Sequence, residues 1–256
     1  MPGILDSFRL DGKVAIVTGA ERGLGRGIAL ALAEAGADIY GVTHAEARPE
    51  MVSAIAKAGR RYVNHHADLR RVEELPAIVE GAVLSFGRVD ILINNAGIIV
   101  RNDALEFTEK DWDEVMNIDL KTVFFLSQAF ARRVVVQGGG GKIISIASML
   151  SFQGGIRVPS YTAAKSGVRG ITMSMANEWA KHGIQVNAIA PGYMATDNTT
   201  LLRADEKRSA EILGRIPAAR WGEPSDLAGA AVFLASPASD YVTGATLAVD
   251  GGWLGR

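Results

Sequence analysis

Short runs of apolar, mostly β-branched residues recur along the whole chain, and longer stretches of another pattern separate them. The first run, Val14-Ala15-Ile16-Val17-Thr18, is too short for a typical helix and is rich in residues that favour strands. A continuous apolar run of this length is typical of a strand that is buried on both faces. The same pattern predicts seven strands, at residues 14–18, 38–43, 62–65, 90–94, 142–146, 185–189 and 246–250.

The longer stretches place apolar residues three and four positions apart, which predicts helices. The clearest of them cover residues 26–35, 72–86 and 111–133. Regular alternation of strands and helices is typical of a parallel sheet with helices on both faces. We therefore predict an α/β fold built on a doubly wound, seven-stranded parallel sheet.

No linker divides the 256 residues. A chain of this length fits either one α/β domain or two smaller domains. The glycine run at residues 138–141 stands directly before a predicted strand, so we interpret it as a connection and not as a domain boundary. We expect a single domain over residues 1–256.

The segment from about residue 192 to residue 221 is more polar than its surroundings and has a helical pattern near residues 203–213. It follows the sixth predicted strand. Loops at the carboxyl ends of parallel strands border the ligand crevice of such sheets. We therefore predict that this segment forms a lid over a binding site.

Composition narrows the range of functions. The formal net charge of -1 and the lack of long charge runs give no electrostatic basis for binding nucleic acid or a membrane. No stretch approaches the ~20 apolar residues that span a bilayer, and the N-terminus has no apolar signal segment. The absence of cysteine excludes disulfides and cysteine-ligated zinc. We expect a cytoplasmic protein without a metal site, in which His65 and His66 merely end a strand.

A glycine-rich loop follows the first strand and opens the first helix. It reads Thr18-Gly19-Ala20-Glu21-Arg22-Gly23-Leu24-Gly25, with the spacing G-x-x-x-G-x-G. Glycines allow a tight turn and a close approach of the backbone to phosphate, and the helix N-terminus supplies free N–H groups. In this position the loop predicts a dinucleotide site.

The end of the second strand is expected to distinguish NAD from NADP. An acidic residue there would bind the adenosine ribose of NAD, and basic residues would accept the 2'-phosphate of NADP. The position is Thr43, followed by His44, and neither is acidic. Arg22 could meet a 2'-phosphate and Glu46 could oppose it, so these residues leave both cofactors open and favour tolerance of NADP.

Tyr161 and Lys165 are four residues apart, and Ser148 precedes them by thirteen. Residues i and i+4 of a helix share one face, so the phenol and the ammonium are expected to be neighbours. An ammonium favours the charged phenolate and lowers the pKa of the tyrosine from about 10 toward working pH. A hydroxyl on another element could hold the substrate oxygen. The three residues predict a proton-transfer centre.

These features occur together in one order. The glycine loop, Asn94-Asn95-Ala96-Gly97, Ser148, the Tyr161–Lys165 pair and Pro191-Gly192 form a pattern that covers essentially the whole chain. The chain resembles a short-chain dehydrogenase/reductase of the 250-residue type. That resemblance implies a single-domain Rossmann fold and a nicotinamide cofactor.

The resemblance also implies individual roles. Tyr161 would be the general acid or base, Lys165 would lower its pKa and bind the nicotinamide ribose, Ser148 would polarise the substrate carbonyl, and Asn117 would anchor a water in a proton relay. The implied cofactor contacts are Gly19, Arg22, Gly23, Leu24, Gly25, Thr43, Asp68, Leu69, Asn94, Ala96, Gly97, Tyr161, Lys165, Pro191, Gly192 and Thr196.

Three segments, at residues 151–161, 175–182 and 190–196, resemble more narrowly the members of this family that oxidise keto-deoxy sugar acids. That resemblance implies NAD as cofactor, and we follow it while leaving NADP open. A sugar acid carries a carboxylate, which an arginine binds well. We predict that Arg157 or Arg101 binds it, and that Gln153 binds sugar hydroxyls.

Two other functions remain open. A 3-oxoacyl carrier-protein reductase, or another carbonyl reductase, would prefer NADPH and would need a basic docking patch near the site. A non-catalytic dinucleotide sensor on the same fold would usually have lost Tyr161, Lys165 or Ser148, and all three are present.

The helical stretch from about residue 161 to residue 181 has small and apolar residues around much of its surface. A helix that is apolar all round is buried on more than one side. One side would cover the sheet and another would meet a second subunit. We expect an oligomer, and the family resemblance implies a homotetramer.

Overall fold

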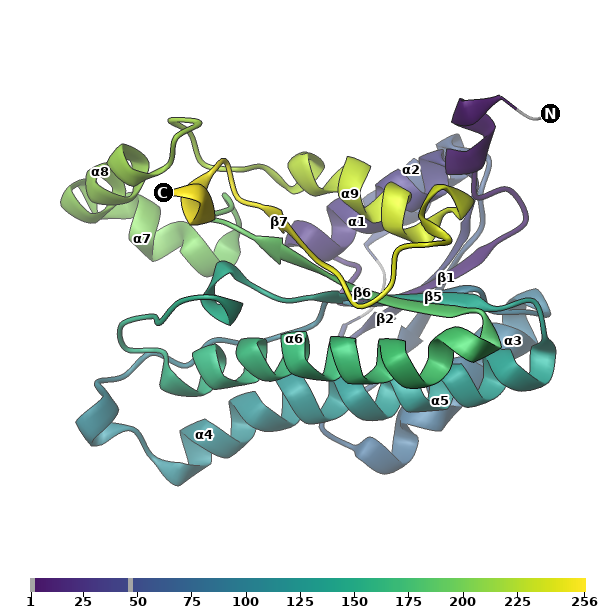
Figure 1. Cartoon of the computed structure of the whole chain (residues 1–256), viewed down its shortest axis with the longest axis horizontal. Helices are drawn as coiled ribbons and strands as arrows, with labels where there is room; N and C mark the ends of the chain where they lie inside the picture. The colour runs from purple at the N-terminus through teal and green to yellow at the C-terminus, as the bar shows by residue number, and fades with distance from the viewer. Residues whose placement is uncertain (1–2, 46–47) are drawn as a thin grey trace.

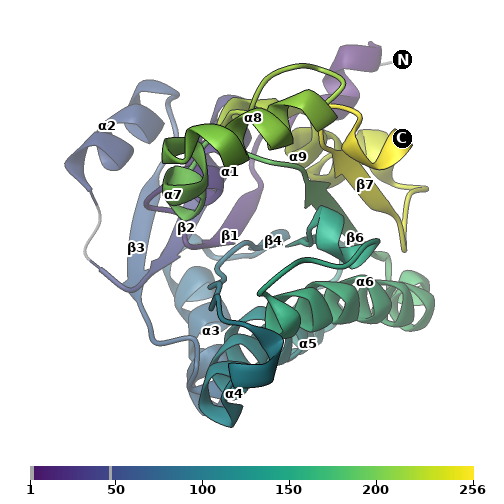
Figure 2. The same cartoon turned by 90° about the vertical axis from the view of Figure 1, so that its left-hand side faces the viewer.

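The computed structural model describes residues 3–45 and 48–256. All strands run parallel in one sheet with the order β3-β2-β1-β4-β5-β6-β7 (Figures 1 and 2). The strands are β1 (Val14–Thr18), β2 (Asp38–Thr43), β3 (Tyr62–His66), β4 (Ile91–Asn94), β5 (Gly141–Ile146), β6 (Ile184–Pro191) and β7 (Thr246–Val249). The predicted sheet is confirmed, with strand ends that differ by one or two residues.

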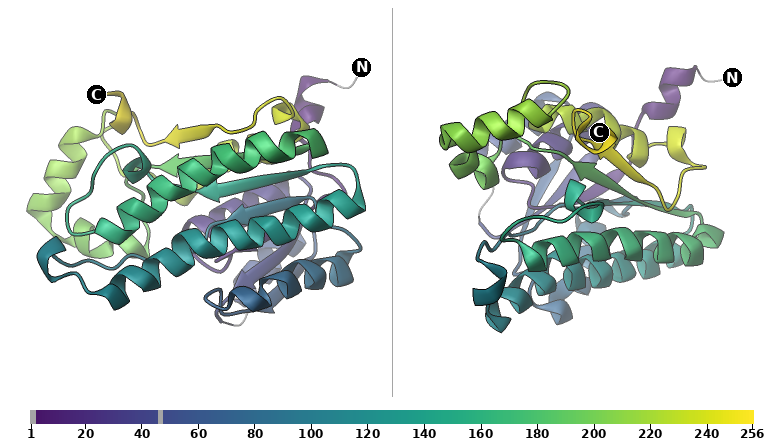
Figure 3. Two further views of the ribbon diagram at one scale, coloured as in Figure 1. Left: turned by 60° about the horizontal axis from the view of Figure 1, so that its bottom comes forward. Right: turned by 60° about the vertical axis from the view of Figure 1, so that its left-hand side comes forward.

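Helices cover both faces of the sheet (Figures 1 and 3). One layer contains α1 (Gly23–Glu34), α2 (Pro49–Lys57) and α9 (Ala228–Ala235). The other contains α3 (Leu75–Phe86), α4 (Glu109–Met116), α5 (Thr122–Gln137) and α6 (Pro159–Trp179). Two short helices, α7 (Thr200–Ala204) and α8 (Glu206–Arg215), stand at one end of the molecule beyond β6 (Figure 1). The single-domain α/β fold is therefore as predicted.

The pleat of each strand explains its unbroken apolar sequence. In β1, Ala15 and Val17 pack into the core under α1 and α9, whereas Ile16 between them packs into the core under α3 and α5. Successive side chains of a strand point to opposite faces, and both faces are covered here. All five residues of β1 are buried as a result.

Some helices differ from the sequence prediction. The helix expected at 111–133 is α4 and α5 joined by a π-helical turn, Asn117–Lys121. The pattern did not single out α9, because its sequence Ala-Gly-Ala-Ala-Val-Phe-Leu-Ala is apolar on every side and shows no period. The helical stretch near 203–213 is split into α7 and α8 at Asp205, which caps α8 by accepting from the Arg208 N–H at 3.0 Å.

The strand order reverses between β1 and β4, and ligand crevices of doubly wound sheets open at such a point. Thr18 joins the two strands there. Its Oγ1 accepts the backbone N–H groups of Asn95 and Ala96, each at 2.9 Å. The glycine loop after β1 and the Asn-Asn-Ala-Gly loop after β4 therefore form one edge.

The segment after β6 leaves and re-enters the body of the protein at one point. Met194 and Gly222 pair as an isolated parallel bridge. The Ala195 N–H donates to the Gly222 carbonyl at 2.7 Å, and the Gly222 N–H donates to the Tyr193 carbonyl at 2.9 Å. The helices α7 and α8 thus belong to an excursion whose two ends are held together.

In the part of the chain that the structure describes, no helix is long and apolar enough to cross a membrane.

Candidate active site

Tyr161 and Lys165 lie one turn apart at the start of α6. Pro159 begins this helix at a position where its missing N–H costs nothing. The Lys165 ammonium is 5.4 Å from the centroid of the Tyr161 ring, and its Nζ donates to the Ile146 carbonyl at 2.9 Å. Both side chains line one cavity together with Ile146, so the end of β5 and the start of α6 share one site.

Ser148 follows β5 directly and caps the 3-10 turn Met149–Ser151. Its Oγ accepts the Leu150 N–H at 3.1 Å. Its side chain also reaches Tyr161, where hydrogen bonding works to lower the pKa of the phenol. The three residues that the sequence grouped as a proton-transfer centre therefore lie together.

Tyr161 holds its proton more tightly than the sequence predicted. Burial raises the pKa of the Tyr161 phenol above its ordinary value; Lys165 opposes this shift and Asp119 adds to it. The predicted direction, toward a lower pKa, is wrong for the chain by itself. Sequence reasoning counted the lysine charge and could not count the loss of water around the phenol.

The structure places Asp119, and not Asn117, beside Lys165. Asp119 Oδ2 is 3.2 Å from Lys165 Nζ, and Asp119 lines the cavity whereas Asn117 does not. Residues two positions apart on a helical turn point to nearly opposite sides. Asn117 therefore lies outside the cavity lining and its predicted role stays a prediction, while a carboxylate two residues later stands beside Lys165.

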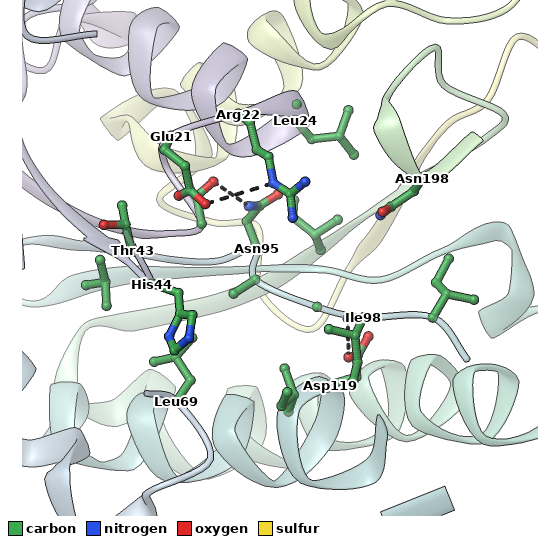
Figure 4. A pocket seen from close by; sticks show the side chains of 18 of the residues that line it. Glu21, Arg22, Leu24, Thr43, His44, Leu69, Asn95, Ile98, Asp119 and Asn198 are labelled. Carbon is green, nitrogen blue, oxygen red and sulfur yellow. Dashed lines mark hydrogen bonds and ion pairs between the residues drawn. The ribbon is translucent and has the colours of Figure 1, made fainter. Parts of the chain in front are cut away.

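The cavity has a volume of about 430 Å³ and lies along the edge formed by the two loops (Figure 4). Helix α1 begins in its wall, and Arg22 at the N-cap makes no side-chain hydrogen bond to the first-turn N–H groups. A methyl group at Gly25 would overlap the Gly19 carbonyl oxygen, so the loop tolerates no side chain there. Free N–H groups at a helix start and a tightly turned glycine loop fit a pyrophosphate.

Most of the residues predicted to contact a cofactor line this cavity. They are Gly19, Arg22, Gly23, Leu24, Thr43, Asp68, Leu69, Ala96, Gly97, Tyr161, Lys165 and Thr196.

Four of the predicted residues lie outside the lining. Gly25 acts through the turn, and Asn94 is buried below, where its Nδ2 donates to Ser127 Oγ at 3.0 Å. Gly192 lines a second, smaller cavity of about 200 Å³, and Pro191 ends β6 beside it. These four residues therefore support the walls of the site and do not line the cavity.

The cations near Thr43 and His44 are held by carboxylates. Arg22 Nη1 is 3.3 Å from Asp197 Oδ2, which bridges the glycine loop and the segment after β6. Side-chain hydrogen bonds from Arg70 lower the pKa of Asp68 to about 2. Glu46, which the sequence set against Arg22, lies outside the described residues. A 2'-phosphate would have to compete with Asp197 for Arg22.

The three predicted substrate residues have different surroundings. Arg101 Nη2 donates to the Asn198 carbonyl at 3.1 Å, and its charge is close enough to work toward a lower Tyr161 pKa. Arg157 forms an ion pair with Asp103, in which Nε and Oδ1 are 3.1 Å apart. Gln153 Oε1 accepts the Trp253 indole N–H at 3.2 Å. Only Arg101 of the three combines proximity to Tyr161 with freedom from a carboxylate partner among the described residues.

Comparison with known proteins agrees with this geometry. A family model described as enoyl-(acyl carrier protein) reductase matches residues 19–254. A 2-dehydro-3-deoxy-D-gluconate 5-dehydrogenase of Escherichia coli (strain K12) is 65% identical over 253 residues, which is 99% of this chain and 100% of that protein. The chain belongs to the short-chain dehydrogenase/reductase family.

Solved structures of short-chain dehydrogenases/reductases superpose closely on this one. An Agrobacterium tumefaciens protein with bound NADP is 54% identical, with a TM-score of 0.91 over 98% of this chain and 99% of that one. A gluconate 5-dehydrogenase of Burkholderia cenocepacia, in complex with NADP and tartrate, is 39% identical, with a TM-score of 0.92 over 99% of this chain and 100% of that one.

Sequence reasoning missed several lining residues of this short-chain dehydrogenase/reductase. Asp119, Asp197 and Arg70 all bring charge to the cavity. Asp197 follows Thr196, and Arg70 follows Asp68 by two, so the neighbours of predicted residues were a usable signal. Asp119 likewise follows the predicted Asn117 by two, but the sequence does not show the π-helical turn that contains both residues.

Proposed function

We propose that this chain interconverts a secondary alcohol and a ketone on a keto-deoxy sugar acid of the 2-dehydro-3-deoxy-D-gluconate or 2-deoxy-D-gluconate type, with NAD or NADP. The observation that carries the proposal is the meeting of Tyr161, Lys165 and Ser148 with a cavity that fits a dinucleotide. The substrate class rests on the E. coli relative, which matches over its full length.

In this proposal the protein supplies orientation and the proton. Tyr161 gives a proton to the substrate oxygen in reduction and takes it back in oxidation. Ser148 holds that oxygen, and Lys165 favours the ionised form of Tyr161. The bound nicotinamide supplies or accepts the hydride.

The cofactor contacts also remain part of the proposal. The N–H groups at the start of α1 and the glycine loop would hold the pyrophosphate, with Asp68 and Leu69 beside the adenine and Thr196 beside the nicotinamide. NAD is the cofactor we expect, and NADP remains open. Two related structures contain NADP, and the Arg22–Asp197 pair is exposed enough to rearrange.

The substrate carboxylate is assigned to Arg101, and residues 192–221 to a lid over it. One observation supports this: Arg101 already contacts the backbone of Asn198 in that segment. Gln153 and Arg157 would shape the rim, since each is engaged by another side chain.

Oligomeric state and location are further proposals. A homotetramer is supported by the apolar side chains of Met173 on α6 and Val136 on α5, which are 43% and 80% exposed on two helices of the same layer. Light scattering would test the oligomer. A cytoplasmic location, which cell fractionation would test, remains a prediction.

The function is tested by Tyr161→Phe. Removing the phenolic O–H while keeping the ring is expected to lower kcat by about 10²- to 10⁴-fold, the usual contribution of a general acid–base group. Cofactor affinity, measured by titration calorimetry, is expected to stay within a few-fold. Tyr241→Phe is the matched control, because Tyr241 is fully exposed. Undiminished turnover in Tyr161→Phe would refute the proton-transfer role.

A substrate panel separates the two catalytic readings. Keto-deoxy-hexonates and β-ketoacyl thioesters are compared by kcat/KM, each with NAD and with NADP. The kcat/KM of the sugar acids is expected to exceed that of the thioesters by roughly tenfold or more. A clear preference for the thioester with NADPH would favour an acyl carrier-protein reductase, in keeping with the description of the family model.

A further inference from the structure

Asp119 is a carboxylate with 0% exposure, and the proposed roles above leave it unused. It belongs to the π-helical turn Asn117–Lys121 between α4 and α5, and such turns are frequent at functional sites. A buried carboxylate is costly unless it is paired and hydrogen-bonded. The buried position of the Asp119 carboxylate in this turn therefore indicates a role in the site.

One oxygen of Asp119 accepts a hydrogen bond, and the other lies at ion-pair distance from Lys165 without a hydrogen bond of its own among the described residues. The Ile98 N–H donates to Oδ1 at 2.8 Å, and Oδ2 is 3.2 Å from Lys165 Nζ (Figure 4 shows the first contact). A methyl group at Gly97 would come within 2.8 Å of Oδ2. The loop after β4, the π-helical turn and α6 thus close around one carboxylate.

Lys165 is fixed by this arrangement. Of its three N–H donors, one binds the Ile146 carbonyl at 2.9 Å and another faces Asp119. Burial alone would lower the pKa of Lys165, but Asp119 and Tyr161 raise it above its ordinary value. Burial raises the pKa of Asp119, and Lys165 opposes that shift. Each partner of the pair thus favours the charged form of the other.

Tyr161 therefore faces an ion pair and not a lone ammonium. The groups that act on it are Lys165, Asp119 and Arg101, together with the hydroxyl of Ser148. The negative charge of Asp119 opposes the attraction that Lys165 would exert on a phenolate. Burial is the largest influence, and it raises the pKa of the Tyr161 phenol.

We propose that Asp119 is a positioning residue that fixes Lys165 and offsets its charge beside Tyr161, which favours the phenol form that donates a proton in reduction. This rests on the proposed function of Tyr161 and adds a direction to it. A protonated Tyr161 holds the proton that reduction of a ketone consumes. Oxidation of the alcohol needs the phenolate and is favoured at alkaline pH.

Protons and electrons balance in both directions of the proposed reaction. Reduction adds a hydride to the carbonyl carbon, taken from the reduced cofactor, and a proton to the carbonyl oxygen, taken from Tyr161. The products are a secondary alcohol, the oxidised cofactor and a tyrosinate, which solvent reprotonates. Oxidation runs the same transfers in reverse.

The test is Asp119→Asn, which removes the charge but keeps the shape and the acceptor for the Ile98 N–H. Tyrosinate absorbance of the full-length protein is titrated with pH, with and without cofactor, and the same variant carrying Tyr161→Phe is subtracted to isolate Tyr161. The midpoint is expected to move to lower pH, with roughly tenfold more tyrosinate at a fixed pH below it. The rising limb of kcat/KM for oxidation is expected to move in the same direction.

Asp240→Asn is the matched control. Asp240 pairs with Lys142 at 2.7 Å, at the opposite end of β5 from the site, so this change removes the same charge from another lysine–aspartate pair. Both the midpoint and the pH profile are expected to stay as in the unaltered protein.

An unchanged or higher midpoint in Asp119→Asn would overturn the proposal. If that variant does not fold, the unaltered protein still decides, because a Tyr161 midpoint at or below neutral pH contradicts the inference. Failure of the function itself has a different signature, namely turnover that survives Tyr161→Phe. If Tyr161→Phe loses turnover and Asp119→Asn leaves the titration midpoint unchanged, only the role proposed here for Asp119 is refuted.

Discussion

At the scale of single residues, the site depends on which charges are already engaged. Arg157 and Arg101 were equal candidates for a substrate carboxylate in the sequence. Arg157 has a backbone φ of 64°, an uncommon conformation for a residue with a side chain, and pairs with Asp103. Among residues 3–45 and 48–256, the Arg101 side chain has only a backbone carbonyl as hydrogen-bond partner, and a carboxylate is a stronger acceptor than a carbonyl.

Arg101→Ala is therefore expected to lower kcat/KM for the sugar acid by roughly 10- to 100-fold, because a charged hydrogen bond contributes about 1.5–3 kcal/mol. Most of the loss is expected in KM, since the contact is made before and during the reaction. Arg157→Ala serves as the control, with an effect of less than about threefold. A larger loss in Arg157→Ala would reverse the assignment.

At the scale of elements, the strands and the first catalytic helix follow from local patterns. The buried strands could be predicted because their apolar runs need only the two covered faces, and Tyr161 and Lys165 because α6 keeps a regular period. Asp119 could not be predicted, because one π-helical turn changes the direction of the side chains that follow. The split between α7 and α8 was also hidden, since Asp205 caps one helix where a single helix was expected.

The segment after β6 is held by the C-terminal turn in a way that no local pattern shows. Trp253 is 4% exposed, and its ring centroid lies 4.8 Å from the ring centroid of Tyr193. The Arg215 guanidinium lies 4.1 Å from the centroid of the Trp253 ring. Gln153 accepts its indole N–H. One side chain therefore joins the loop after β5, the start of the excursion and α8.

Trp253→Ala is expected to cost about 3–5 kcal/mol and to lower Tm by roughly 6–20 °C at fixed protein concentration. Circular dichroism measures the transition, and limited proteolysis is expected to cut first within residues 195–221. Trp253→Phe keeps most of the packing and loses only the N–H donor, so its effect is expected to be clearly smaller. Early cleavage in another part of the chain would contradict this role for the C-terminal turn.

At the scale of the whole molecule, the charges nearly cancel. A formal net charge of -1 gives little long-range attraction for an anionic cofactor. Salt effects on cofactor binding therefore report local contacts in the cavity. NADP differs from NAD by one 2'-phosphate, and Arg22 is the cation of the glycine loop placed to meet it, at 60% side-chain exposure and paired with Asp197.

An exposed ionic contact is worth less than about 1 kcal/mol and weakens as salt shortens the Debye length from about 30 Å at 0.01 M to 3 Å at 1 M. Over that range, affinity for NADP is expected to fall roughly two- to fivefold more than affinity for NAD, measured by titration calorimetry. Arg22→Ala is expected to remove the difference between the two cofactors, because the remaining contacts are common to both. Equal salt dependence in the unaltered protein would show that Arg22 stays with Asp197 and that the 2'-phosphate is met elsewhere or not at all.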